Sequence, residues 1–254
     1  MPLPKGGSFL LATDGSVYLA TDNLIKKSAY WADRSIRSEL SIGLIAGEND
    51  YTSNFTAEFR RQVNAKAMKG LTAISYKVNG SIERKTGTDA CIILSNHTEA
   101  KMCLFEAKLP RLSTKVNAWD SIQKSTSQSH FSSQLQRQRR YKPNFVIWEM
   151  FYCDEDFEKQ PAPFLNYVSS CITHDEAINY DLSRTNKNAA WTDSELIDMH
   201  NKSKIYQVDE LIELVCVCNM GTPINVQRVN GLLSEMERTV DVLSIHYDEN
   251  NENS

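Results

Sequence analysis

The stretch TDACIILSNHTEAKMCLFEAK, residues 88–108, decides how this chain is expected to fold. Two apolar runs surround a polar segment, a pattern typical of two strands joined by a turn. Charged residues interrupt the pattern, since Asp89 opens the first strand and Glu106 and Lys108 lie inside the second. The hairpin therefore either exposes these charges to solvent or gathers them into a site.

The register of the hairpin bears on this choice. A turn centred between His97 and Thr98 sets Asp89 directly opposite Glu106, with side chains about 5 Å apart on one face of the sheet. Side chains alternate along a strand, so Lys108 shares the face of Glu106. Two facing carboxylates repel each other, and a purely structural hairpin gains nothing from them.

A divalent cation between the two carboxylates would make their pairing favourable. Mg²⁺ prefers oxygen ligands, commonly one or two carboxylates together with waters and substrate phosphates. Lys108, next along the same face, would orient the nucleophile and stabilise negative charge that grows on phosphorus. The spacing therefore predicts a hydrolytic site for phosphodiesters.

The bulk properties set the class of protein. The chain has 254 residues, a formal net charge of −4 and six cysteines. No apolar run approaches the roughly 20 residues that span a bilayer, and the N-terminus lacks a secretory core. The cysteines lie mostly within apolar runs, which suits reduced thiols. We expect a cytoplasmic protein with no membrane partner.

Basic residues concentrate between positions 101 and 142. Nine lysines and arginines stand there against two acids, a local balance of +7. Such a zone is compatible with a surface that binds phosphates, and equally with the solvated face of a helix.

The rest of the chain predicts a single α/β domain. Its core would span residues 48–152, with a central mixed sheet flanked by helices, and residues 153–254 would form a C-terminal, largely helical elaboration. An N-terminal hairpin would precede the core. Before the quoted stretch, the patterns predict a hairpin around Asp14-Gly15, a helix over 23–45, a helix from about Asp50 to Gly70 and a strand pair around Asn79-Gly80. After it they predict a helix over 129–141, a buried strand over 144–152 and an irregular region over 153–190. The last part of the chain is expected to hold a capping box from Thr192 to Glu195, a helix or strand over 208–221, and a final helix from 222 onwards.

The motif in the hairpin resembles that of the PD-(D/E)xK nuclease superfamily. Asp89 is followed after 16 residues by Glu106-Ala107-Lys108, and Thr88 stands where the motif name has proline. The resemblance covers about residues 48–152. It implies a restriction-endonuclease-like core and a nuclease that uses Mg²⁺ or Mn²⁺. Asp89 and Glu106 would then be metal ligands, and Lys108 would be catalytic.

The helix over 129–141 supplies a further candidate. Phe131, Leu135 and Gln138 follow helical spacing with Gln134 beside them, so both glutamines lie on or near the inward stripe. By the resemblance, Gln134 is the first candidate for a catalytic glutamine and Gln138 the second. The alternative is a glutamine that only satisfies backbone groups.

An acid on the first core helix would complete the metal site. Glu48 fits the resemblance better than Glu58, while a helix N-terminal or surface acid is the plain alternative for either. Glu83 is a weaker candidate. The tryptophans, Trp119 among them, are expected to serve as packing groups rather than as platforms for bases.

The resemblance also implies partners. DNA is favoured over RNA, a two-fold homodimer would suit double-strand cleavage, and the context would be prokaryotic restriction or anti-phage defence. The residues expected to hold phosphates are Arg137, Arg139, Arg140 and Lys142. Two alternatives stay open, a non-catalytic nucleic-acid-binding or assembly module with the same fold, and an ordinary edge hairpin whose charges face water.

Overall fold

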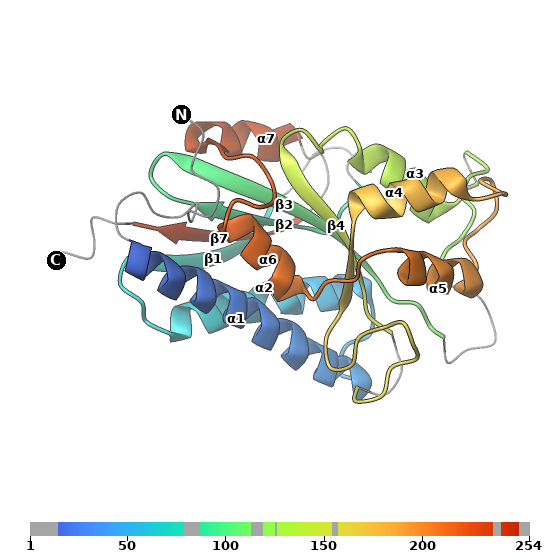
Figure 1. The fold of residues 1–254 in the computed structure, drawn as a ribbon, viewed down its shortest axis with the longest axis horizontal. Coiled ribbons are helices and arrows are strands. Elements are labelled where there is room, and N and C mark those ends of the chain that lie inside the picture. The colour runs from blue at the N-terminus through green and yellow to red at the C-terminus, as the bar shows by residue number, and fades with distance from the viewer. Residues whose placement is uncertain are drawn as a thin grey trace.

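The chain folds as an α/β protein in which a mixed seven-stranded sheet is flanked by helices (Figure 1). The computed structural model describes residues 15–78, 87–112, 119–124, 126–153, 157–235 and 240–248. The elements in chain order are α1 (Gly15–Ser41), α2 (Glu48–Ala65), β1 (Leu71–Val78), β2 (Ala90–Ser95), β3 (Glu99–Lys108), α3 (His130–Gln138), β4 (Phe145–Phe151), β5 (Ser170–Thr173), α4 (His174–Ser183), α5 (Asp193–Lys202), α6 (Val208–Cys216), β6 (Ile224–Asn225), the 3₁₀ turn η1 (Val226–Arg228), α7 (Val229–Glu235) and β7 (Val240–Tyr247).

The strand order is β1-β7-β2-β3-β4-β5, and the short β6 pairs with the start of β3. The pairs β7–β2 and β3–β4 are parallel, while β1–β7, β2–β3, β4–β5 and β3–β6 are antiparallel. The chain's last described strand therefore lies between two strands from its first half. Among the described residues, no helix has both the length and the apolar character needed to cross a bilayer.

Helices cover both faces of the sheet. The face that carries Phe105 and Ala107 packs against α1, α2 and α6. On the opposite face, one apolar cluster forms beneath α7 and another beneath α3, α4 and α5. Figure 1 shows α1 and α2 on one side of the sheet and α7 and α3 on the other. Glu106 and Lys108 alternate with Phe105 and Ala107, so they face the second side, between its two apolar clusters.

The register predicted for residues 88–108 is confirmed. Ala90 pairs with Phe105 and Ser95 with Ala100, and the backbone N–H of Asp89 donates to the carbonyl of Phe105 over 3.0 Å. The paired register ends at Ala90 and Phe105, and Asp89 follows it on the β2 side with its N–H on the same Phe105 carbonyl. The side chain of Asn96 accepts hydrogen bonds from the two residues that follow His97, which fixes the tight turn locally.

Two predictions at the ends of the chain are wrong. Residues 16–20 continue α1 and do not form the second strand of an N-terminal hairpin, although Asp14 itself lies outside the described residues. The predicted final helix is instead β6, η1, the short α7 and the strand β7. Val242 and Leu243 are both fully buried on opposite faces of the sheet, and a strand covered on both sides reads along the sequence like a buried helix.

Other local predictions are confirmed. The helices at 23–45 and after Asp50 are present as α1 and α2, and 208–216 is helical. The Thr192–Glu195 capping box heads α5. β1 pairs with β7, whereas the turn predicted at Asn79-Gly80 and the candidate Glu83 lie outside the described residues.

Candidate active site at the carboxyl end of strand β3

Three predicted residues meet at the end of β3. The ammonium of Lys108 donates to Oε1 of Glu106 over 2.6 Å, and the amide of Gln134 on α3 donates to the same oxygen. Glu106 is 2% exposed and Lys108 is 4% exposed. The second oxygen of Glu106 is buried and has no hydrogen-bond partner among the described residues. The interpretation of these charges as a solvent-facing hairpin is therefore wrong.

Asp89 is locked against the neighbouring strand. Its Oδ2 accepts the backbone N–H of Ala107 over 2.9 Å, between Glu106 and Lys108 in sequence. This bond ties the Asp89 side chain to the backbone of β3 just beyond the paired residues and keeps its carboxylate close to Glu106. The charge of Asp89 acts on both Glu106 and Lys108.

Glu48 reaches the same place from the first turn of α2. Its Oε1 accepts the backbone N–H of Leu109 over 3.0 Å, and its Oε2 lies 4.0 Å from the Lys108 ammonium. The competing candidate Glu58 instead bonds Arg61 and Gln62 on its own helix. Glu48 is therefore the α2 acid that joins the acid–lysine cluster, which we define as Asp89, Glu106, Lys108, Gln134 and Glu48.

The cluster carries more acid than base. Burial lowers the pKa of Lys108, but the carboxylates of Glu106, Glu48 and Asp89 raise it by more, so the ammonium stays protonated at neutral pH. Burial raises the pKa of Glu106 well above its ordinary range, and the charge of Asp89 adds to the effect while Lys108 opposes it. An added positive charge would therefore be favourable here.

A buried polar layer beneath the cluster was missed by the sequence analysis. Glu149 on β4 is in register with Glu106, is fully buried, and lies 3.6 Å from Nδ1 of His174 through Oε1. The amide of Gln138 donates to the carbonyl of Gly87 over 2.8 Å and its oxygen lies 3.0 Å from His174 Nδ1. The only sequence signal for Glu149 was a single acid inside an apolar run.

Gln138 thus has a different role from Gln134. It ties α3 to the segment just before Asp89, through Gly87. Gly87 has φ +69°, and a Cβ there would come within 3.2 Å of Cα of Gln134 and of the guanidinium of Arg137. A glycine at position 87 adopts this left-handed backbone without strain and leaves room for α3 to pack closely against it.

His130, the first residue of α3, was also missed. It is half-buried, and burial together with the positive charges of Lys108 and Arg137 lowers its pKa. A neutral imidazole therefore lies within the electrostatic reach of the cluster.

The predicted phosphate-binding residues are not brought together. The guanidinium of Arg137 donates to the hydroxyl of Ser133 and lies next to Gly87, the residue two before Asp89 of the cluster. Arg139 and Arg140 are exposed beyond the end of α3, and within the described residues neither makes an ion pair.

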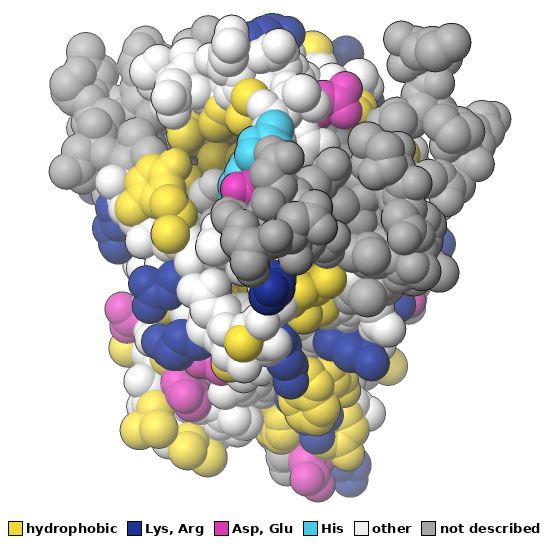
Figure 2. Space-filling view, turned by 90° about the vertical axis from the view of Figure 1, so that its left-hand side faces the viewer, with side chains coloured by type: hydrophobic (Ala, Val, Ile, Leu, Met, Phe, Trp, Pro, Cys, Tyr) yellow, Lys and Arg dark blue, Asp and Glu magenta, His cyan; other side chains and the backbone are white. Residues whose placement is uncertain are grey.

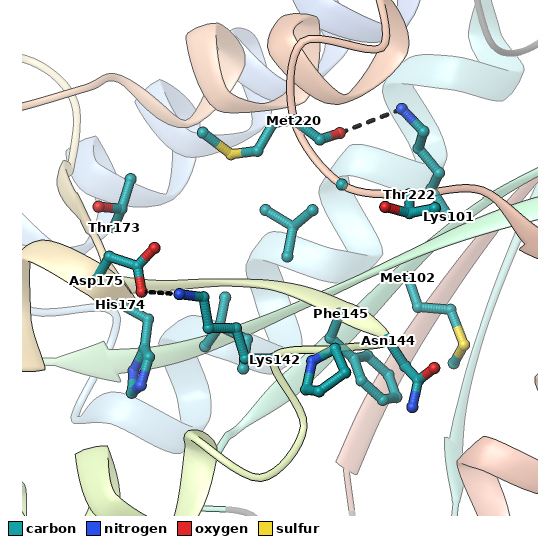
Figure 3. Close-up of a pocket in the computed structure, with 14 residues that line it drawn as sticks. Lys101, Met102, Lys142, Asn144, Phe145, Thr173, His174, Asp175, Met220 and Thr222 are labelled. Carbon is teal, nitrogen blue, oxygen red and sulfur yellow. Dashed lines mark hydrogen bonds and ion pairs between the residues drawn. The ribbon is translucent and has the colours of Figure 1, made fainter. Parts of the chain in front are cut away.

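Lys142 faces a separate hollow. It pairs with Asp175 over 2.5 Å at a cavity of about 410 Å³, where Lys101 also donates to the carbonyl of Met220 over 3.2 Å (Figure 3). On the end of the molecule in Figure 2, lysine and arginine side chains are scattered among hydrophobic and acidic ones in the part that the structure describes. Three lysines of the basic zone thus have different partners: Lys108 bonds Glu106, Lys142 bonds Asp175, and Lys101 bonds backbone carbonyls.

Within the described ranges, no three histidine, cysteine, aspartate or glutamate side chains converge as a preformed metal site. No family model, curated protein or solved structure matches this chain. The geometry of the cluster is therefore the basis on which a function can be assigned.

Proposed function

We propose that this chain is a metal-dependent nuclease with a restriction-endonuclease-like core, which hydrolyses phosphodiester bonds in DNA. The observation that carries the proposal is the convergence of Lys108 and Gln134 on one oxygen of buried Glu106, beside Asp89. A structural hairpin has no use for a buried acid, a buried lysine and a half-buried second acid at one point, since burying charge costs free energy.

The donor set fits a hard divalent cation. Oε2 of Glu106 and Oε1 of Gln134 are buried and accept no hydrogen bond within the described residues. Asp89, Glu106 and Glu48 would hold Mg²⁺ or Mn²⁺, which bind carboxylate oxygens. When bound, the cation would supply Lewis-acid stabilisation of the phosphate oxygens.

Lys108 and its partners would do the remaining work. Because three carboxylates keep Lys108 protonated, its ammonium acts as a donor that orients an attacking water and stabilises charge on the phosphate. Glu106 holds Nζ of Lys108 in place, and Gln134 fixes the orientation of that carboxylate. Asp89 couples the same geometry to the backbone at Ala107.

The test compares wild type with Lys108→Met on plasmid DNA and on RNA, in Mg²⁺ and in EDTA. A matched control is Lys202→Met, which removes an exposed lysine paired with Asp198 on α5. We expect Mg²⁺-dependent DNA cleavage by wild type and the control, and cleavage about 10²–10³-fold slower by Lys108→Met. Cleavage that survives EDTA, or equal cleavage by all three proteins, contradicts the mechanism. Absence of cleavage with retained DNA binding would favour the non-catalytic module.

A further inference from the structure

A cavity of about 520 Å³ opens beside the acid–lysine cluster. It is lined by Ala46–Asp50, Leu109, Arg111 and Trp119. Glu48 belongs both to this lining and to the cluster, because it bonds the backbone of Leu109 and lies 4.0 Å from Lys108. The cavity therefore adjoins the point where β3 ends.

Burial determines how a substrate can approach. Glu106 and Lys108 are almost fully buried, while the side chain of Glu48 is 37% exposed. A ligand of Lys108 on this side must pass Glu48 and enter the cavity. Ligands of open α/β sheets commonly bind outside the carboxyl ends of parallel strands, and β3 and β4 are such a pair.

The lining has the chemistry of a nucleotide site. Arg111 is exposed and offers a guanidinium, the group that best matches a phosphate. Trp119 is half-buried, with edge contacts to Phe131 and Trp191 at centroid distances of 5.3 and 6.0 Å, and the same side chain lines the cavity. It thus both packs, as expected, and presents an aromatic wall on which a base can stack.

We propose that this cavity binds the nucleotide next to the scissile phosphate, in a single-stranded segment of the substrate. Arg111 holds a phosphate and Trp119 contacts the base. The strand is single because a base can reach Trp119 only by leaving its own stack. Glu48 and Asp50 repel a bare phosphate, so binding requires a divalent cation. The proposal rests on the proposed function and adds the class of substrate.

The experiment measures fluorescence anisotropy of a labelled single-stranded DNA oligonucleotide and of its blunt duplex, in Ca²⁺ and in EDTA. We expect wild type to bind the single strand more tightly, and only in Ca²⁺. Arg111→Gln should weaken this binding about tenfold, and Trp119→Phe about threefold. Asp50→Asn should instead strengthen binding of the single strand in EDTA, because it removes a negative charge that repels the phosphate.

The matched control is Arg228→Gln. Arg228 is exposed in η1, which follows β6 at the start of β3, the end of that strand opposite Lys108. The affinity of the Arg228→Gln variant for the single-stranded oligonucleotide should stay within about twofold of the wild-type value. Thermal melting of each variant verifies that a weaker signal does not come from unfolding.

Cleavage of the same oligonucleotides, read on a gel, separates this inference from the function on which it rests. Equal affinity of wild type and Arg111→Gln, or a duplex bound as tightly as the single strand, overturns the subsite even if wild type cleaves DNA. Binding that depends on Arg111 without any cleavage supports the subsite and overturns hydrolysis. No binding by wild type overturns both.

Discussion

Strand β3 contains two buried lysines, and their partners differ in kind. Lys101 is 1% exposed and donates to the carbonyls of Val215 and Met220, where α6 ends. Lys108 is 4% exposed and bonds a carboxylate, with two further acids acting on its charge. Carbonyls cannot change charge, whereas carboxylates can take up a proton or bind a cation. A buried lysine therefore indicates chemistry only when its partners are titratable and a cavity adjoins them.

Replacing each lysine by methionine tests this contrast most directly. Lys108→Met should lower the single-turnover rate of DNA cleavage by about 10²–10³-fold, because it removes a donor aimed at developing charge. Lys101→Met should retain the cleavage rate per folded molecule. It should lower the free energy of unfolding by about 1–3 kcal/mol, because buried carbonyls lose their donor. Urea unfolding gives the second quantity, and equal losses of cleavage would remove the distinction.

Gly87 and Gly43 allow a matched test of how tightly α3 is held to the cluster. Both have positive φ, +69° and +78°, but a Cβ at Gly43 meets nothing within 4 Å, whereas at Gly87 it meets Gln134 at 3.2 Å. Gly43→Ala should cost about 1 kcal/mol from the backbone alone. Gly87→Ala should cost about 1–3 kcal/mol more and reduce cleavage, because it displaces α3 from Asp89. Equal unfolding energies would show that the contact with α3 adapts freely.

The pH dependence of cation binding distinguishes the two ends of β3. Burial raises the pKa of Glu106, so the native state holds this proton more tightly than the unfolded chain, and stability falls as pH rises above about 4.3. A cation offsets this loss because it favours the ionised carboxylate. The Mg²⁺-induced rise in Tm should therefore grow from pH 5 to pH 8, reaching about 2–4 °C at a concentration several times Kd.

Glu106→Gln is the control for that measurement. It should abolish both the Mg²⁺ shift and its growth with pH in scanning fluorimetry. Lys101→Met should leave them in place, since Lys101 bonds carbonyls at the other end of the strand. A Mg²⁺ shift that persists in Glu106→Gln would mean that the cation binds elsewhere.

The smallest effect is expected far from both lysines. Thr192 caps α5 through the backbone of Glu195. Thr192→Ala should lower the free energy of unfolding by about 1 kcal/mol and leave cleavage unchanged. A parallel loss of cleavage would show that the activity follows global stability rather than the geometry of the cluster.

The cluster was largely predictable because its information is local. The turn after Asn96 and the two-residue alternation of a strand fix the register, and that register brings Asp89, Glu106 and Lys108 together. Helical spacing turns Gln134 inward in the same way. Glu48 needed the resemblance, because its distance from Lys108 depends on how α2 packs.

The parts that sequence analysis missed depend on contacts distant in the chain. Glu149 is recognisable only beside Glu106, once β3 and β4 pair in parallel. The basic zone is divided because Lys101, Lys108 and Lys142 each find a different partner. Charge counted along a sequence does not reveal which side chains the fold will bury.

The sequence by itself determined the hairpin, its register and the acids and lysine that face one another across it. Local turn geometry and side-chain alternation suffice for that. Only the tertiary structure decided that residues 240–247 form a strand in the middle of the sheet, between β1 and β2. An apolar segment buried on every side has the same pattern as a helix or as a strand, and the choice depends on the neighbours that supply its hydrogen bonds.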